Sequence, residues 1–364
     1  MKMYMVTLSL LVGPMAVSCS PAAGALSQLK QTLTPNANPL GMDKSYLRHF
    51  ESLPLSGSVA AGKQPWSDFS WPSNAAGIAN RWTSDEMFTG FEYDLYSFDD
   101  VSSMPREEKI KLSPAEKFDI YTAQYDYPTV ASEWERNYEG AEDDEGLRNG
   151  WAAASLNFLE PKAVKVMSED GVEIEFHAAD VKALLSYYQG QIAYSRTVQL
   201  GEKCRVNFDQ VRERACKETN PGAFHMVLAN ELGRHKSGFI LDAKKEDAPT
   251  SWNSPVHGFT AKLVQDNLPP SPFATAGTRK EVEIEAVVTV SDTGLPQHDA
   301  TNGTEFHNDV TIVYKYRLEL DARGYILGGT WLGQERPDSM WRQDKPLFER
   351  DFLKLQTLYE ASIK

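Results

Sequence analysis

Cysteine, basic residues and long hydrophobic runs are all scarce in this chain of 364 residues. The three cysteines are Cys19, Cys204 and Cys216, and the C-x11-C-x8-H-x9-H spacing from Cys204 to His235 matches no common zinc site. Lysine and arginine total 37 against 51 acidic residues, and the net charge of −14 repels phosphate backbones and anionic lipids. The sequence therefore argues against nucleic acid as a partner. It also contains no calcium-loop pattern, so we expect no metal or other cofactor.

A single strongly apolar run lies at the N-terminus. Val6–Val17 follows a lysine and precedes the small residues Pro21–Ala25, an order typical of an export signal, and it is too short to cross about 30 Å of hydrocarbon comfortably. We therefore predict that residues 1–20 are an export signal or a lipoprotein signal. The alternative is a weakly hydrophobic buried helix. Cys19 resembles the lipid-accepting cysteine of bacterial lipoproteins, so a lipid on Cys19 is the only membrane anchor that we expect.

The two later cysteines fit this prediction of export. Once Cys19 is lipidated or removed with the signal, Cys204 and Cys216 remain as an even count in an oxidising compartment. We predict that they form a disulfide. The mature protein is then secreted, periplasmic or lipid-anchored at the cell surface.

The chain is long enough for about two domains of ordinary size, and its composition changes along its length. After the signal, residues 21–130 are rich in turn-forming residues and are expected to wrap around the rest of the molecule. Residues 131–265, with mixed helix and strand patterns, form the expected core. Residues 266–364 contain strands that alternate with period two, which predicts an antiparallel β-rich region and an α+β fold.

Local signals place individual elements within these regions. Ser113 followed by Pro114 is a helix start signal, and alternation on both sides of Glu169–Gly171 predicts a hairpin. The predicted helices are Lys44–Ser52, Ser113–Tyr125, Asp180–Tyr188 and a buried helix that starts near Gly150. The predicted strands are the hairpin Ala163–Phe176, Val282–Val290, Asp309–Leu320 and Tyr325–Trp331.

A histidine and an aspartate suggest a catalytic dyad. Phe224–Leu228 and Gly238–Asp242 are short apolar runs, and pairing them around a turn at Gly233 would place His225 opposite Asp242. Facing Cβ atoms in such a pair lie about 5 Å apart, close enough for the carboxylate to orient the imidazole as a base. A surface ion pair in a hairpin is the alternative. The prediction depends on register, because a slip of one residue turns one side chain to the other face.

Such a dyad needs a nucleophile. The best place for one is the N-terminus of the buried helix near Gly150, where backbone N–H groups lower the pKa of a thiol. The residues there, Gly146–Trp151, include neither cysteine nor serine. Arg148 cannot serve, because a guanidinium stays protonated with a pKa above about 12.

Several longer stretches, spread from about Pro65 to Trp341, point to one family. They are Pro65–Ser67, Trp71–Pro72, Gly77–Trp82, Ser113–Asp119, Trp134–Glu135, Asn220–His225, Ser251–Phe259 and Gly328–Trp341. Their order resembles the transglutaminase-elicitor family, secreted protein-glutamine gamma-glutamyltransferases of oomycete plant pathogens with bacterial relatives. Ser251–Phe259, SWNSPVHGF, is similar to that family's surface elicitor peptide V-W-N-Q-P-V-x-G-F/Y and departs from it at Ser251 and Ser254.

The resemblance implies a papain-like, transglutaminase-like core with a site of three residues. Family members have a cysteine nucleophile in W-x-G-x-C-x-G-W-A, a histidine in N-P-G-x-F-H and an aspartate in G-F-x-x-D. The last two match His225 and Asp242, whereas the cysteine position falls on Arg148, with Asn149–Ala152 matching after it. The implied partners are glutamine and lysine side chains of proteins or peptides. A thiolate would attack the glutamine carboxamide, release ammonia and pass the acyl group to the lysine amine.

Three interpretations follow from the arginine at the nucleophile position. We favour an exported relative with weak or no turnover, which uses the same cleft to hold peptides and in which Arg148 pairs with Asp242. The second is catalysis through another nucleophile, for which Cys204, Cys216 and Ser155 are available. The third is a residue change particular to this sequence, so that the natural protein is an ordinary enzyme.

Two tryptophans are candidate substrate-binding residues. Trp151 is either a core residue or, beside the nucleophile position, an indole N–H donor to an oxyanion. Trp252, with Pro255, either defines an exposed loop or anchors Phe259 in the core. The histidines without a partner pattern, which we expect at the surface, are His235, His257, His298 and His307.

Overall fold

The computed structural model describes residues 38–82, 90–142, 145–202, 218–244, 251–294 and 307–364. The predicted signal at 1–20 with Cys19, the predicted disulfide between Cys204 and Cys216, and His298 lie outside the described residues. Those predictions therefore stay predictions.

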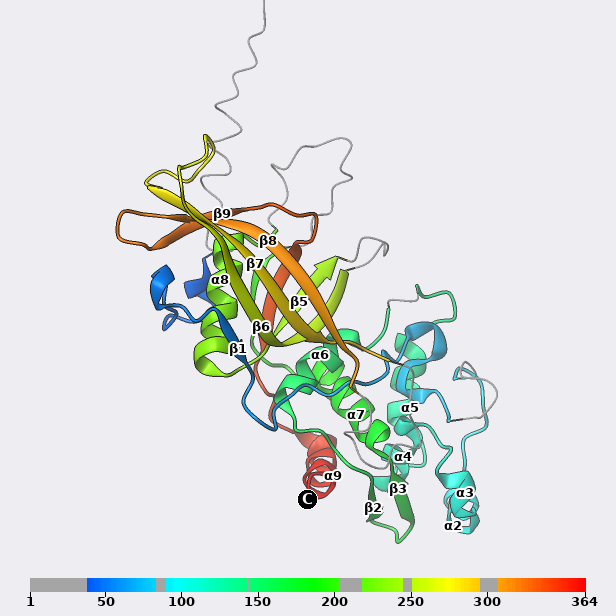
Figure 1. Ribbon diagram of the computed structural model, residues 1–364. Helices are drawn as coiled ribbons and strands as arrows, with labels where there is room; N and C mark the ends of the chain where they lie inside the picture. The colour runs from blue at the N-terminus through cyan, green and yellow to red at the C-terminus, as the bar shows by residue number, and fades with distance from the viewer. Residues whose placement is uncertain (1–37, 83–89, 143–144, 203–217, 245–250, 295–306) are drawn as a thin grey trace, which may run out of the picture.

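One antiparallel sheet organises the molecule (Figure 1). Its strands follow the order β4-β10-β5-β6-β7-β8-β9, and the short strand β1 pairs with β6 beside this path. β6 is shared, because its first part pairs with β5 and its later part with β7 and β1. The strands are β1 Ser56–Ser58, β4 Thr197–Gly201, β5 Phe239–Lys244, β6 Ser251–Leu268, β7 Lys280–Ser291, β8 Asp309–Leu320, β9 Ile326–Trp331 and β10 Pro337–Gln343; β2 Val164–Met167 and β3 Glu173–Phe176 form a separate hairpin.

Most helices gather below the sheet, whereas α8 lies alongside it (Figure 1). The α-helices are α2 Phe98–Ser103, α3 Arg106–Lys109, α4 Pro114–Tyr121, α5 Pro128–Arg136, α6 Arg148–Asn157, α7 Ala178–Tyr187, α8 Pro221–Leu228 and α9 Leu353–Ser362. α7 and α8 continue directly into the π-helical turns η6 (Tyr188–Ile192) and η7 (Ala229–His235), and the 3₁₀ turns are η2 Pro39–Gly41, η3 Phe50–Ser52, η4 Ser73–Ala75, η5 Gly77–Ala79 and η9 Arg350–Phe352. No helix in the described part of the chain has the length and hydropathy needed to cross a membrane.

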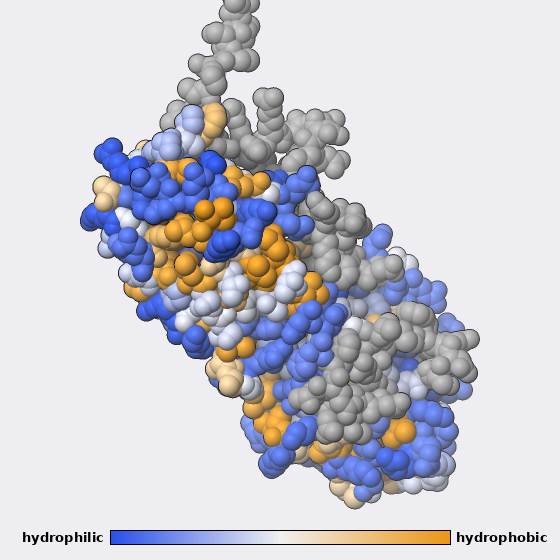
Figure 2. All heavy atoms as spheres, in the orientation of Figure 1, coloured by the Kyte–Doolittle hydropathy of each residue, from blue (hydrophilic) through white to orange (hydrophobic). Residues whose placement is uncertain are grey.

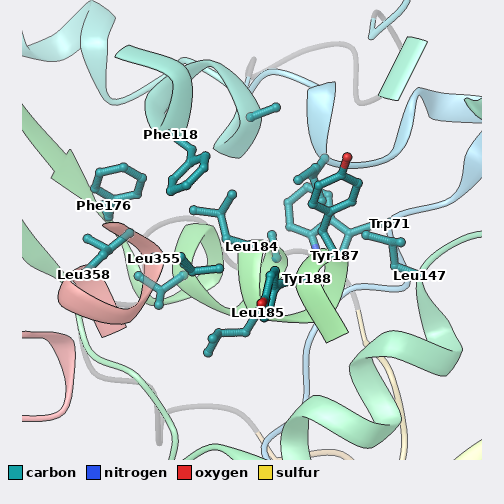
Figure 3. Packing of buried hydrophobic residues seen from close by; sticks show 14 of the residues in the cluster. Trp71, Phe118, Leu147, Phe176, Leu184, Leu185, Tyr187, Tyr188, Leu355 and Leu358 are labelled. Carbon is teal, nitrogen blue, oxygen red and sulfur yellow. The ribbon is translucent and has the colours of Figure 1, made fainter. Parts of the chain in front are cut away.

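Two hydrophobic cores meet at the sheet. The first, the helical core, includes Trp151 of α6, Leu184 of α7 and Leu355 of α9; Figure 3 shows how α7 and α9 pack against Phe118. The second, the sheet core, lies between α8 and strands β5 to β9. Strand β5 belongs to both, because Ile240 packs into the helical core and its neighbours Phe239 and Leu241 into the sheet core. This alternation follows from the period of two along a strand.

The structure confirms the α+β prediction and several local ones. The expected strands appear as β7, β8 and β9, and the expected hairpin as β2 and β3. Ser113 caps α4 through a reciprocal capping box with Glu116. The region boundary that we placed at residue 265 falls inside β6, and the single sheet joins the predicted core to the predicted C-terminal β-rich region.

Two predicted elements are wrong. Lys44–Ser52 is not a helix, since only Phe50–Ser52 forms a 3₁₀ turn. The run Phe224–Leu228 is not a strand but the body of α8. Its true start is Asn220-Pro221, where the Asn220 side chain accepts the Gly222 N–H and proline occupies the first helical position.

Candidate active site

The N-terminus of α6 presents Arg148 to the end of the sheet. Arg148 is the first helical residue, after Leu147, whose side chain makes no capping hydrogen bond. The position of this tip is fixed from outside the helix, because the Leu147 N–H donates to the Ser70 carbonyl at 2.9 Å. On its inner side α6 closely approaches the end of α7 and the start of η6. A Cβ placed on Gly150 would lie 2.2 Å from the Ser186 carbonyl oxygen, so only glycine fits there.

The guanidinium of Arg148 binds the residues that follow β7. Its Nη1 lies 3.0 Å from Asp292 Oδ1, and its Nη2 donates to Thr293 Oγ1 at 2.5 Å. The two charged side chains are 12% and 9% exposed, so water screens this ion pair poorly. Asp292 is therefore a partner of Arg148 in the structure, and the pairing of Arg148 with Asp242 that we expected stays a prediction.

One extended segment, residues 64–71, here called the strap, holds both partners in place. The Ser291 hydroxyl donates to the Pro65 carbonyl at 3.1 Å, and the Gly294 N–H donates to the Asp68 carbonyl at 3.0 Å. The Ser70 carbonyl in the same segment accepts the Leu147 N–H described above. The strap thus positions the α6 tip and the residues around Asp292 together.

A chain of amides lies beside Arg148. Asn253 Nδ2 donates to Asn149 Oδ1 at 2.6 Å, and the Trp341 indole donates to Asn253 Oδ1 at 2.7 Å. Asn149 is exposed at the helix tip. In register, Asp242 of β5 pairs with Asn253 of β6 and with Ser339 of β10. This face of the sheet therefore presents amide, indole and carboxylate groups to the start of α6.

His225 does not join this group. It lies on α8, fully buried, with Nδ1 2.8 Å from the Tyr316 hydroxyl. Its ring lies 5.8 Å from that of Phe50, and burial lowers the pKa of His225 to about 4. Its Nε2 is buried and has no hydrogen-bond partner.

The strand alternation separates the predicted dyad. Leu241 packs with Phe224 in the sheet core, whereas Ile240 packs with Trp151 in the helical core. Asp242 shares the face of Ile240, so it points towards α6, while His225 on α8 packs against the opposite face. The hairpin that would have made the two residues neighbours does not exist, because its first half is helical.

The other predicted site residues are placed as follows. Trp151 is fully buried and its indole donates to the Trp66 carbonyl at 3.1 Å, so it is a core residue. The Ser155 hydroxyl is buried and bonds within its own helix to the Ala152 carbonyl. Trp252 contributes its backbone to β6, and the described part of that segment, from Asn253 on, is largely buried strand rather than exposed loop.

Sequence reasoning missed two acidic residues, the partner of Arg148 and the partner of His257. Asp292 comes directly after β7, where a strand end was predictable but its contact with Arg148 was not. His257, which we expected at the surface, is 8% exposed, and its Nε2 lies 3.1 Å from Asp309 Oδ1. Within the described ranges, no three His, Cys, Asp or Glu side chains come together as a metal site.

Comparison with known proteins defines the class. The structure is similar to the crystal structure of the GP42 transglutaminase from Phytophthora sojae, with a TM-score of 0.66 and 18% sequence identity over 90% of this chain and 98% of that chain. At this identity the likeness shows a shared fold. The sequence profile of the transglutaminase elicitor family matches residues 43–349, and the chain therefore belongs to that family. A comparison with curated proteins gave no match.

Proposed function

We propose that the chain is a transglutaminase-like protein of the protein-glutamine gamma-glutamyltransferase type whose acyl-transfer turnover is weak or absent. The observation that supports this most directly is the environment of Arg148. The residue occupies the helix tip where the family resemblance expects a thiol, and its guanidinium is engaged by Asp292 and Thr293. A guanidinium has no lone pair available at neutral pH, so it forms no covalent acyl intermediate.

The geometry around the tip supports the same proposal. A transglutaminase cycle needs an imidazole that takes the proton from the nucleophile and returns it to the leaving ammonia. The matching histidine, His225, packs in the sheet core beyond β5. A change of Arg148 to cysteine would therefore supply sulfur without supplying this base.

We further propose that the surface around the α6 tip holds peptides without turning them over. Asn149, Asn253 and Trp341 present amide and indole groups there, and these match the carboxamide of a glutamine side chain in hydrogen-bonding capacity. Glutamine- and lysine-containing segments of proteins are the partners that we propose. Export, with residues 1–20 as the signal, remains part of this proposal, and mass spectrometry of the mature N-terminus would test it.

The turnover proposal is tested by hydroxamate formation from a glutamine-donor peptide and hydroxylamine. We expect none from the natural protein and at most a trace from Arg148→Cys. Arg148→Ser is the matched control, since it creates a similar cavity without sulfur. Hydroxamate formation by the natural protein would contradict the proposal. Full activity in Arg148→Cys, absent from Arg148→Ser, would show that only the nucleophile had been lost.

Peptide binding is tested by calorimetric titration of the same donor peptide. We expect Asn149→Ala to weaken binding, because it removes an exposed amide beside Arg148. Gln356→Ala on α9 serves as the control, as it removes an exposed amide from a different helix. Equal affinity in the two variants, or no measurable binding by the natural protein, would overturn the proposed peptide site.

A further inference from the structure

A ladder of charged pairs runs along the solvent face of β7 and β8. Glu285 stands opposite Lys315 with 3.3 Å between Oε2 and Nζ, and Glu283 stands opposite Arg317 with 3.3 Å between Oε2 and Nη2. Both rungs join opposite charges, as cross-strand neighbours on an exposed face usually do.

The last rung breaks this rule. Glu281 stands opposite Glu319, and the two residues are only 3% and 4% exposed. Within the described part of the chain, neither carboxylate forms an ion pair. Directly opposed positions place the Cβ atoms about 5 Å apart, so two ionised groups here repel in a poorly hydrated setting. Burial and the neighbouring Glu281 raise the pKa of Glu319.

What covers this rung is the segment 269–279, which connects β6 to β7. The Ser271 N–H donates to Glu281 Oε1 at 2.7 Å, and the Thr275 N–H donates to Glu319 Oε2 at 3.1 Å. The two glutamates thus hold the same segment at two points. Between these points lies Phe273, whose side chain is 59% exposed. The connection between β6 and β7 lies at the end of the sheet that is far from α6 (Figure 1).

The residues that face the pair from the two outer strands are uncharged. Opposite Glu281 on β6 is Leu268, and opposite Glu319 on β9 is Gly328. The other charged groups in this part of the sheet are Glu283 and Arg317, which pair with each other, Asp266 and Lys280, which also pair, and Arg279 within the covering segment.

We propose that Glu319, buried opposite Glu281, takes up a proton and that the two residues so form a proton-dependent lock on the segment 269–279. With the proton present, the repulsion between the two side chains is removed, and both groups still accept the N–H bonds of the segment. When the pH rises, the proton leaves to solvent, the two carboxylates repel, and the segment loosens. The lock therefore favours low pH, and its release changes how Phe273 is presented. Figure 2 shows that the end of the molecule that contains the sheet carries hydrophobic patches among hydrophilic residues.

Hydrogen–deuterium exchange of the full-length protein tests the lock. Glutamine imitates a protonated glutamate, so Glu319→Gln should slow exchange of the amides of residues 271–279 severalfold at about pH 8 and leave it unchanged at about pH 5, each compared with the natural protein at the same pH. Glu281→Gln should act in the same way. Glu283→Gln, on the next rung, should not slow the exchange of this segment in a pH-dependent way.

Two results would overturn the proposal. One is faster exchange of the segment in both glutamine variants at both pH values, which would mean that the carboxylates hold it only as ionised acceptors. The other is a difference between Glu319→Gln and the natural protein that is the same at both pH values. Neither outcome depends on acyl transfer or on peptide binding at α6.

Discussion

His225 is a buried imidazole that the native state keeps neutral. Burial lowers its pKa from 6.5 to about 4, and its Nδ1 pairs with the Tyr316 hydroxyl. In the unfolded chain the same group takes up a proton near its ordinary pKa, so the unfolded state binds more protons as the pH falls. The contribution to the free energy of unfolding is complete above about pH 6.5 and is lost towards about pH 4.

We expect His225→Gln to remove this pH dependence while keeping a partner for Tyr316. Between about pH 6.5 and about pH 4 the natural protein should lose about 3 kcal/mol more unfolding free energy than the variant. Urea unfolding of both proteins at each pH measures the difference. Groups that both proteins share cancel, including Asp68 and Asp119, whose pKa values burial raises to about 7. The same pH dependence of the unfolding free energy in both proteins would contradict a neutral buried His225.

Arg148 and Asp292 should be coupled energetically. Removing one partner of a poorly hydrated pair takes away part of what stabilises the other charge, at a cost of about 3 kcal/mol. We expect Arg148→Met to lower the free energy of unfolding by about this amount, and the added change Asp292→Asn to recover most of it. A double-mutant cycle by urea unfolding measures the coupling, and a value near zero would mean that the pair contributes nothing.

At the scale of the element, α6 depends on a close backbone approach. A Cβ on Gly150 would meet the Ser186 carbonyl at 2.2 Å and the Gly190 Cα at 3.0 Å. We expect Gly150→Ala to cost about 1–3 kcal/mol of unfolding free energy through overpacking. Gly140→Ala is the control, because the nearest atom to its Cβ is a Tyr138 ring carbon at 3.8 Å. Thermal unfolding of the two variants compares them, and equal midpoints would contradict tight packing at Gly150.

One of the two elements that sequence reasoning misjudged is α8. A short apolar run is compatible with a strand or a buried helix, and we predicted a strand at Phe224–Leu228 only because the run is short and apolar. The helix start at Asn220-Pro221 was visible in the sequence and decides between the two. Elements with alternation over longer stretches, such as β7 and β8, were predicted well, because one face of each is buried and the other is not.

At the scale of the whole molecule, the two cores share strands. Ile240 and Leu241 are neighbours in β5, yet they pack into different cores. We therefore expect one cooperative unfolding transition by calorimetry. Ile240→Ala and Leu241→Ala should each lower the free energy of unfolding by about 2–4 kcal/mol, and the transition should remain single in both variants. Two resolved transitions, one sensitive to each variant, would mean that the cores are independent.

The family, the fold class and the helix tip at Arg148 were accessible from the sequence, but the partners at that tip were not. Arg148 and Asp292 are 144 positions apart, and no local pattern links them. The hairpin that we predicted to pair His225 with Asp242 is wrong for a related reason, since it assumed that neighbours in sequence pair across a turn, whereas Phe224–Leu228 is helical. Which face of β5 each residue takes depends on packing between distant elements.

The strap has a consequence for synthesis. Its contacts to Ser291 and Asn308 span 226 and 241 positions, so a nascent chain emerging from the ribosome holds Pro65 and Ser67 without partners until most of the polypeptide has been made. Closing such long loops is slow. The region around Arg148 is therefore completed among the last steps of folding, and truncated translation products that end before β8 should be recognisable to chaperones and proteases as unfinished.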